Sequence, residues 1–474
     1  MTSQHQERFF EEELCAHLAA NGWLYSPDDT GYDKERALFP ADLFAWLEET
    51  QPDELAKLVK PAMSADAQAR ALDGIAARVA QRMDADQSLG GSSLRVLRGG
   101  VKHQTASFYL MRKRPEMTVN PTVNDQYAAN RLRVMRQVHY STKHAARSID
   151  LVFFLNGIPV ATAELKTDFT QSIADAKRQY RMDRPPAGEP LLGFGTRALV
   201  HFAVSNDEVW MTTKLAGPDT FFLPFNRGDQ GHAGNPADED GGSPTTYLWR
   251  DVLQRDSWLD IIGKFVHWET TKRRDPDTGK VTVDQKLIFP RFHQLDAVTK
   301  IVADARRNGP GQRYLIQHSA GSGKTRSIAW SAHRLATLHD ENNQKVFDSV
   351  IVITDRTVLD DQLQEAVKQI ESKDGVVATI STREAAKRSF SSKSGYLTEV
   401  LTSGKLIIVV TLQTFPFVLS AIQKNKALHG KSFAVIADEA HSSQTGAAAS
   451  KLKQVLSAEE LAQIDDGGDI DVEA

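Results

Sequence analysis

Apolar residues are distributed in two different ways along the chain. After Phe289, four short runs rich in β-branched residues alternate with longer amphipathic stretches. Runs of this kind are typical of strands that are buried on both faces of a parallel sheet. The stretches between them predict helices near residues 325–338 and 359–370. The four predicted strands lie at residues 313–318, 349–354, 405–411 and 433–438.

Before Phe289 the pattern is mixed. Phe10, Leu14 and Leu18 form one stripe of a helix that we predict over residues 7–20. The segment 41–85 is rich in Ala and Leu and predicts further helices. Beyond it we expect a helix near residues 171–181, strands near 198–204 and 208–212, and a Gly-, Asp- and Pro-rich connecting loop at 227–246.

A predicted β-hairpin carries charge at its root. Two apolar runs, residues 149–155 and 158–165, flank the turn-forming pair Asn156-Gly157. The charged residues at the open end of this hairpin are Asp150, Glu164 and Lys166. The last two are separated by one residue, so their side chains share one face of a strand.

The register of the hairpin decides whether its carboxylates can meet. A two-residue turn would place Asp150 on the face opposite Glu164. For both to reach one metal ion, the connection must contain an odd number of residues, or a β-bulge must intervene. We expect a three-residue connection that pairs Leu155 with Pro159 and holds Gly157 in the left-handed conformation.

The charged set at the hairpin root has the composition of a magnesium-dependent nuclease site. Asp150 and Glu164 would hold the metal against a phosphodiester, and Lys166 would activate water or stabilise the developing charge. Glu11 and Glu12, on the first predicted helix, could supply a further carboxylate. The alternative is a surface salt bridge between Glu164 and Lys166 beside an incidental aspartate.

Basic and aromatic residues lie on both sides of the hairpin. The segment 131–147 carries five Lys or Arg residues and no carboxylate, which suits either a solvated face or contact with DNA phosphates. The helix after the hairpin is also basic. The residues of these two segments that we expect at DNA are Arg147, Arg178, Gln179 and Tyr180.

A phosphate-binding loop, HSAGSGKT, lies between a predicted strand and a predicted helix. Its glycines would let backbone N–H groups turn toward phosphate oxygens at the positive end of the helix. Lys324 would reach the β- and γ-phosphates, and Thr325 would bind magnesium. His318 stands where the general pattern has glycine. The residues expected to contact the nucleotide here are Ser319, Ala320, Gly321, Ser322, Gly323, Lys324 and Thr325.

An acidic pair follows a later strand in FAVIADEAH. We expect Asp438 to organise the magnesium ion, Glu439 to orient the attacking water, and His441 to link the nucleotide site to the nucleic acid. An acidic helix cap is the alternative. Gln294, before the phosphate loop, would read adenine. The loop residues expected on a DNA backbone are Arg356, Thr411 and Gln413.

Composition limits the class of protein. The 474 residues are 41% hydrophobic and 25% charged, as in ordinary globular proteins. The single cysteine excludes an internal disulfide and suits a cytoplasmic location. No apolar run approaches the roughly 20 residues that a membrane span needs. Since the net charge is −4, a DNA site must be a local patch.

The motifs together carry a family resemblance. The part after Phe289 resembles the first motor domain of superfamily 2 helicases. The Asp…Glu-x-Lys set resembles the core of restriction-type nucleases. Over nearly the whole chain, SIDLVFFLNGIPVATAELK, HFAVSNDEVWM and HSAGSGKT followed by DEAH resemble the restriction (R) subunit of type I restriction-modification enzymes.

The resemblance implies a fold, an activity and partners. It implies an α/β multidomain protein, with a restriction-endonuclease-like domain at 1–250, a helical connector at 251–285 and a RecA-like P-loop domain at 286–474. It implies Mg²⁺-dependent cleavage and ATP-driven translocation of double-stranded DNA, together with specificity and methylation subunits. It also implies that Asp150, Glu164 and Lys166 are the nuclease core and that Glu11 contributes to it.

Two features depart from the family pattern, and two rival functions stay open. The family's Gln-x-x-x-Tyr element has Ala176 where glutamine would precede Tyr180. The second motor lobe is missing after the acidic tail, and we therefore interpret the chain as a fragment of a longer protein.

The rival functions are a different helicase–nuclease fusion in repair or phage defence, and a nuclease-inactive DNA clamp or scaffold.

Overall fold

The chain forms two compact units in the computed structural model, residues 1–292 and residues 293–474. Each unit contains its own sheet, and each is described by itself below. The structure describes residues 3–86, 91–167, 172–274, 279–319, 321–354, 357–370, 376–380, 382–390, 393–412 and 414–438.

The first unit is built on a mixed seven-stranded sheet with the order β1-β4-β5-β6-β7-β8-β9. β6 pairs antiparallel with β5 and parallel with β7, so it lies at the centre. All eight residues of β6 are buried, as expected for a central strand covered on both faces. The strands span Leu24–Ser26, Leu132–His139, Ser148–Leu155, Ile158–Leu165, Val200–Val204, Val209–Thr212 and Leu223–Pro224.

The hairpin formed by β5 and β6 brings its charged root residues onto one face by a different route from the one predicted. Leu155 pairs with Ile158, so the connection has two residues, and the expected three-residue connection with Leu155 opposite Pro159 is wrong. A β-bulge between Phe153 and Phe154 then shifts the register, and Leu151 pairs with Ala163. Continuing this register places Asp150 opposite Glu164. The bulge, which was the other possibility, therefore supplies the extra residue.

The turn itself is as glycine-dependent as predicted. Asn156 and Gly157 both have positive φ, 50° and 78°, which is the conformation of a tight hairpin turn. The Asn156 amide is buried and donates to the carbonyl of Leu110 at 2.9 Å. A Cβ on Gly157 would lie 2.4 Å from the carbonyl oxygen of Phe39. The turn is thus packed tightly against the start of α2.

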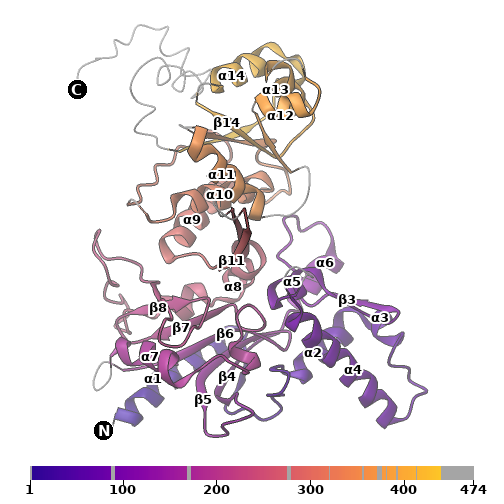
Figure 1. Ribbon diagram of the computed structural model, residues 1–474, viewed down its shortest axis with the longest axis vertical. Helices are drawn as coiled ribbons and strands as arrows, with labels where there is room; N and C mark the ends of the chain where they lie inside the picture. Colours follow the sequence, from indigo (N-terminus) through magenta and orange to yellow (C-terminus); the bar gives the residue numbers. More distant parts are fainter. Residues whose placement is uncertain are drawn as a thin grey trace. The chain divides into compact units, whose positions relative to one another are not determined.

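Some helices of this unit lie against the sheet, and α3 to α6 gather to one side of it (Figure 1). α1 (Ser3–Ala20) packs on β6, and α7 (Ile173–Arg178) packs on β7. α7 continues into a π-helical turn, η2 (Gln179–Asp183). The other helical segments of this unit are α2 (Pro40–Thr50), α3 (Pro52–Ala56), α4 (Ala65–Asp84), α5 (Ser93–Gly99), α6 (Pro121–Ala128), η3 (Pro190–Leu192), η4 (Leu248–Val252), α8 (Arg255–Asp260) and η5 (Ile261–Phe265).

Two short hairpins complete the first unit. β2 (Val101–His103) pairs with β3 (Ala106–Phe108) next to α4. β10 (His267–Arg274) pairs with β11 (Val281–Ile288). The Thr213 hydroxyl, just after β8, donates to the carbonyl of Leu287 at 2.9 Å. This contact ties the second hairpin to the main sheet.

The second unit contains a parallel sheet with the order β13-β14-β12-β15. Three of its strands fall where the apolar runs predicted them, β12 (Ser349–Thr354), β14 (Ile407–Thr411) and β15 (Phe433–Ala437), and β13 (Val377–Thr379) is a short edge strand. The helices are α9 (Phe292–Asn308), α10 (Lys324–Ala336), α11 (Thr357–Ile370), α12 (Thr382–Lys387), α13 (Lys393–Thr402), α14 (Phe415–Lys424) and η6 (Lys426–Leu428).

The strand predicted at residues 313–318 does not form. This segment has no regular secondary structure, and Leu315 is 84% exposed. Its Tyr314 hydroxyl donates to the Asp304 carboxylate at 2.7 Å, which holds the segment beside α9 and away from the sheet. The prediction from this apolar run alone was therefore wrong.

The search for membrane-spanning segments gives a negative result for the described part of the chain. Within it, no helix has both the length and the apolar character needed to cross a bilayer.

Candidate functional site

A pocket at the root of the β5–β6 hairpin contains most of the predicted nuclease residues. Its volume is about 510 Å³. Glu11 comes from α1, Asp150 from β5, and Lys166 directly follows β6. The lining residues are Arg8, Glu11, Arg136, Gln137, Ser148, Asp150, Leu165, Lys166, Gln179 and Arg184.

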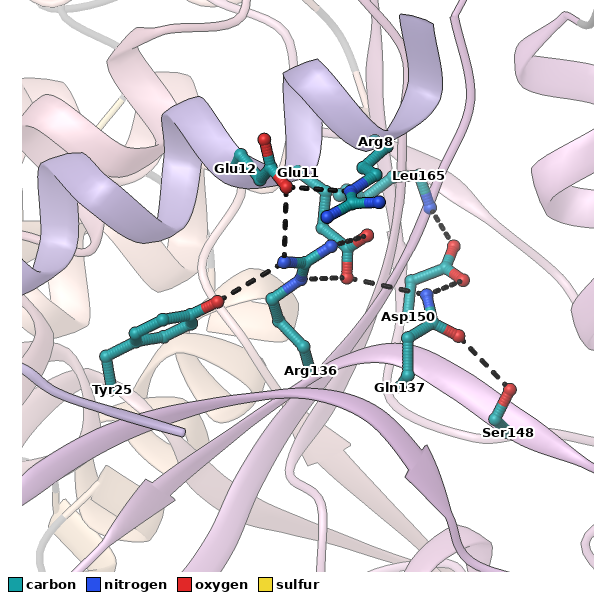
Figure 2. Close-up of polar contacts among 9 residues, drawn as sticks. All are labelled: Arg8, Glu11, Glu12, Tyr25, Arg136, Gln137, Ser148, Asp150 and Leu165. Atoms are coloured by element: carbon teal, nitrogen blue, oxygen red, sulfur yellow. Dashed lines mark hydrogen bonds and ion pairs between the residues drawn. The ribbon is translucent and has the colours of Figure 1, made fainter. Parts of the chain in front are cut away.

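Asp150 is fixed by the neighbouring strand. The backbone N–H of Leu165 donates to Asp150 Oδ2 at 2.8 Å (Figure 2). The register set by the bulge places this carboxylate opposite Glu164. Lys166 is buried and lines the same pocket. The structure therefore brings Asp150, Glu164 and Lys166 together, as the sequence predicted for a nuclease site.

Glu164 is a buried carboxylate that is satisfied on one side only. Its side chain is 0% exposed, and Arg184 Nε donates to Oε1 at 2.7 Å. Oε2 is buried, and no hydrogen-bond donor among the described residues reaches it. Burial raises the pKa of Glu164 well above its ordinary value, Asp150 raises it further, and Arg184 opposes the rise. A cation placed between the two carboxylates would relieve this cost.

Glu11 is held over the pocket by an arginine. Arg136 of β4 contacts both carboxylate oxygens of Glu11, with Nε–Oε1 and Nη2–Oε2 separations of 2.9 and 3.0 Å. The Arg136 guanidinium also lies near Tyr25 and Glu12 (Figure 2). Burial raises the pKa of Glu11, and Arg136 opposes this effect. Glu11 therefore reaches the pocket as expected, but as one half of an ion pair.

Gln137 links Glu11 to Asp150 and was not predicted. Its Nε2 group donates to Glu11 Oε1 at 3.4 Å and to Asp150 Oδ1 at 3.3 Å (Figure 2). Its Oε1 accepts a hydrogen bond from Ser148 Oγ at 3.3 Å. The backbone φ of Gln137 is +47°, a conformation that costs free energy for a residue with a side chain. A strained residue thus lies at the site, between two of its carboxylates.

Three of the five cations of the basic segment 131–147 are paired with carboxylates of the same unit, and Lys143 is exposed. Arg131 and Arg133 both bind the buried carboxylate of Asp42, at 3.1 and 2.6 Å, and Arg136 binds Glu11. The segment contains no carboxylate because its partners come from distant helices. Arg147, the DNA-contact candidate of this segment, is half-buried.

The three predicted DNA contacts on the helix after the hairpin differ in their exposure to solvent. Gln179 lines the pocket, and its Oε1 is buried without a hydrogen-bond donor among the described residues. Arg178 is exposed. Tyr180 is fully buried and its hydroxyl bonds Thr162 Oγ1 at 2.7 Å, so the expectation that Tyr180 contacts DNA is wrong. The side chain instead anchors η2 to β6.

The fit of this pocket to a metal ion rests on a carboxylate pair. Within the described residues, no group of three or more His, Cys, Asp and Glu side chains is arranged to hold a metal. Asp150 and Glu164, with the orphaned Oε2, supply oxygen ligands of the type that Mg²⁺ prefers. Because Mg²⁺ commonly keeps several of its waters, two carboxylates suit it.

The phosphate loop of the second unit has the expected backbone. Gly321 and Gly323 have φ of 74° and 88°, in the left-handed region that glycine favours. Gly323 precedes α10, and Lys324 and Thr325 are its first two residues. A Cβ on Gly321 would meet nothing within 4 Å, so this side of the loop is open. The loop and helix N-terminus fit a phosphate group.

Gln294 lies against the loop. Its Nε2 donates to the carbonyls of Ser322 at 3.2 Å and Gly323 at 3.0 Å. His293 also bonds the Ser322 carbonyl, and its ring packs edge-on against His318 at 4.8 Å between centroids. His318 therefore fills space beside the loop through an aromatic contact. The predicted adenine contact of Gln294 stays a prediction.

The remaining motor residues are described only in part. Asp438 follows β15, and its N–H donates to the carbonyl of Ile353 at 2.9 Å, next to the end of β12. The Thr411 side chain is buried and bonds Thr414, so it is not available to DNA in this structure. Predicted residues that lie outside the described part of the chain are Ala320, Arg356, Gln413, Glu439 and His441.

Comparison with known proteins assigns both units. Residues 10–220 match the family of the type I restriction enzyme R protein N terminus. The first unit is therefore similar to the N terminus of type I restriction enzyme R proteins. Residues 293–462 match the SWI2/SNF2 ATPase family, so the second unit is similar to an ATPase domain. The resemblance found in the sequence is confirmed.

One curated relative shows how far the similarity extends. The type I restriction enzyme HindI endonuclease subunit of Haemophilus influenzae is 23% identical over 344 residues. The match covers 68% of this chain and 28% of that protein. The chain thus matches less than a third of the length of this relative.

Proposed function

We propose that this protein cleaves double-stranded DNA with Mg²⁺ in the β5–β6 pocket and moves DNA with ATP through its second unit. Cleavage would occur away from the recognition site, in an assembly with specificity and methylation subunits. The observation that carries the nuclease part is the pairing of Asp150 opposite Glu164, with Lys166 in the same pocket.

Each pocket residue has a distinct role in this proposal. Asp150 and Glu164 hold the metal, which would polarise the scissile phosphate and lower the pKa of bound water. Lys166 lies near the attacking water and balances the developing negative charge. Glu11 and Gln137 hold the position of Asp150 from the α1 side, since Gln137 bonds both carboxylates.

The motor residues would bind Mg-ATP at the phosphate loop. Lys324 would contact the β- and γ-phosphates, and Thr325 and Asp438 would bind the metal ion. Glu439 would orient water. The open glycine loop before α10 and the ATPase family match support these roles. The restriction-endonuclease-like fold of the first unit and the RecA-like fold of the second are part of the same proposal.

The direct test uses Asp150→Asn in the complete assembly. We expect loss of plasmid cleavage by at least a hundredfold, with DNA-dependent ATP hydrolysis retained, because the substitution removes a metal ligand and leaves the second unit intact. Asp66→Asn, on the exposed start of α4, is the matched control and should cleave normally. Undiminished cleavage by Asp150→Asn would contradict the assignment.

The same assay separates the proposal from a nuclease-inactive clamp. A clamp would bind DNA and show no metal-dependent cleavage even in the wild-type assembly. The ion pairs of Glu11 with Arg136 and of Glu164 with Arg184 are the observation that favours a clamp, because they neutralise carboxylates that a metal would need. Cleavage that requires both Mg²⁺ and Asp150 excludes it.

A further inference from the structure

A second pocket lies in the first unit, on elements that do not contribute to the nuclease pocket. It has a volume of about 530 Å³ and is formed by α4, the end of α5 and the β2–β3 hairpin. Three cationic side chains line it, and the lining contains no carboxylate. The lining includes Arg78, Arg82, Gly100, Lys102, Ser107 and Tyr109.

A hydrogen bond and a close backbone approach join the elements that form the wall of this pocket. Arg78 Nε donates to the carbonyl of Lys102 at 3.0 Å, which ties α4 to β2. Gly100 has φ of +75°, and a Cβ there would lie 2.2 Å from the carbonyl oxygen of Phe108. The hairpin therefore approaches α5 as closely as its backbone permits. A preformed wall reduces the entropy that a ligand must overcome.

Tyr109 extends the pocket with an anchored aromatic ring. Its N–H donates to Gln51 Oε1 at 2.6 Å, and its carbonyl accepts hydrogen bonds from Trp46 and Gln51. The ring is 50% exposed, and the Arg112 guanidinium lies 4.2 Å from its centroid. Arg112, which is not part of the lining, thus contacts this lining aromatic ring through a cation–π contact.

The charge of this pocket differs from that of the nuclease pocket. In the nuclease pocket, Arg136 and Arg184 each bind a carboxylate. For Arg78 and Lys102, no ion pair with a carboxylate occurs among the residues that the structure describes. Glu54 Oε2 accepts a hydrogen bond from the Ser107 N–H at 2.8 Å, so one carboxylate lies beside the lining. Three cations on one concave surface still outnumber it and focus a positive potential there. This local patch is notable in a chain whose net charge is −4.

We propose that this basic pocket binds backbone phosphates of duplex DNA, at a position separate from the nuclease pocket. The inference rests on the proposed function, because it assumes that the chain acts on DNA. Lys102, Ser107 and Tyr109 are exposed, so an extended polymer can reach them from solvent. An open wall with several cations suits a phosphate backbone, whereas a free nucleotide favours a site that encloses its base.

The test measures DNA affinity against salt concentration for the full chain carrying Asp150→Asn, without nucleotide. Fluorescence anisotropy with a labelled duplex gives the slope of log K against log salt. Each lost phosphate contact makes that negative slope shallower by about 0.9. The double variant Arg78→Ala/Lys102→Ala should therefore reduce the magnitude of the slope by roughly 1.8 and weaken binding for all sequences alike.

A matched control lies on the same helix. Arg70 is an exposed arginine of α4 that does not line the pocket, and Arg70→Ala should leave slope and affinity unchanged. Lys102→Glu provides a single substitution at an exposed position, in case the loss of Arg78 disturbs α4. Its unfolding temperature should match that of the parent, and its DNA binding should fall more than that of Lys102→Ala.

Three outcomes would overturn the inference. One is an unchanged slope in both the double variant and Lys102→Glu. Another is an equal loss of slope and affinity in Arg70→Ala, which would show that DNA responds to the overall charge of the surface and not to this pocket. The third is binding of a labelled ATP analogue that survives Lys324→Ala and disappears in Lys102→Glu, because the occupant would then be a free nucleotide. The Asp150→Asn background keeps this test independent of whether the chain cleaves DNA.

Discussion

Glu164 shows how a single buried side chain can indicate function. Its carboxylate has an arginine on one oxygen and no donor among the described residues on the other. A structural ion pair would normally satisfy both oxygens, since an unsatisfied buried acceptor costs about 1–3 kcal/mol. The arrangement makes sense if a cation completes it.

The raised pKa of Glu164 predicts a pH dependence of stability. Because the folded state holds this proton more tightly than the unfolded state, stability falls as pH rises from about 4.3, the ordinary pKa of glutamate, up to the raised folded value. Glu164→Gln cannot ionise, so in EDTA its unfolding temperature should fall less steeply between pH 4 and pH 8 than that of the wild type.

A second carboxylate provides the control for this experiment. Glu12→Gln removes a partly exposed partner of Arg8, at 41% side-chain exposure, and should leave the pH profile close to that of the wild type. Identical slopes for wild type and Glu164→Gln would mean that the buried carboxylate is not protonated more readily than an ordinary one.

Substitution of Gln137 should affect DNA cleavage much more than the stability of the fold. Gln137→Gly relieves the positive φ but removes the bridge between Glu11 and Asp150. The free energy of unfolding should stay within about 1 kcal/mol of the wild type, because relief of strain offsets the entropy of glycine. Cleavage by the assembly should fall at least tenfold, mainly in kcat.

Gln104 offers a matched comparison, since it also has a positive φ, +50°, and is exposed on the β2–β3 turn. Gln104→Gly should change stability by a similar amount and leave cleavage intact. Equal cleavage by both glycine variants would show that Gln137 has no positioning role.

The charged residues at the hairpin root were easier to predict than the residues that hold them. Asp150, Glu164 and Lys166 were recognisable because their spacing on a hairpin has chemical meaning. Arg136, Gln137 and Arg184 were missed as site residues, because no local motif shows which carboxylate each one contacts. The sequence also did not show that Arg131 and Arg136 are paired, because their partners Asp42 and Glu11 lie elsewhere in the chain. The predicted DNA contact of Arg147 stays a prediction.

At the level of elements, one bulge determines the geometry of the pocket. The two-residue turn alone would have turned Asp150 away from Glu164, and the irregularity between Phe153 and Phe154 corrects the register. Sequence periodicity gives the existence of strands but cannot locate a bulge within an unbroken apolar run. Periodicity can also predict a strand that does not form, as at residues 313–318.

The turn that starts this hairpin predicts a large effect of a small change. Gly157→Ala would place a Cβ 2.4 Å from the Phe39 carbonyl and 2.8 Å from the Leu43 nitrogen, both backbone atoms. We expect a loss of more than about 2 kcal/mol in the free energy of unfolding, beyond the usual penalty for alanine at positive φ. Chemical denaturation of the full chain measures it.

Gly231→Ala isolates the conformational part of this penalty. Gly231 has φ of +88°, and a Cβ there would meet nothing within 4 Å. Its substitution should cost about 1 kcal/mol. If Gly157→Ala costs no more than Gly231→Ala, the tight packing of the turn against α2 does not contribute to stability.

At the level of the whole molecule, two compact units contain two different candidate sites. The first contains the carboxylate pocket and the basic pocket, and the second contains the phosphate loop and the parallel sheet. The family matches follow the same division, at residues 10–220 and 293–462. The order of these units could be predicted because each has a local motif, HSAGSGKT in one and a charged hairpin root in the other.

The most direct test is a crystal of the full chain soaked with Mn²⁺, with anomalous scattering used to locate the ion. We predict a peak between the carboxylates of Asp150 and Glu164, bonded to Glu164 Oε2, with its remaining ligands from solvent and backbone. An Asp150→Asn crystal under the same conditions should lack it. A strong Mn²⁺ peak elsewhere in the first unit, with none between these two carboxylates, would contradict the assignment of this pocket as the DNA-cleaving centre.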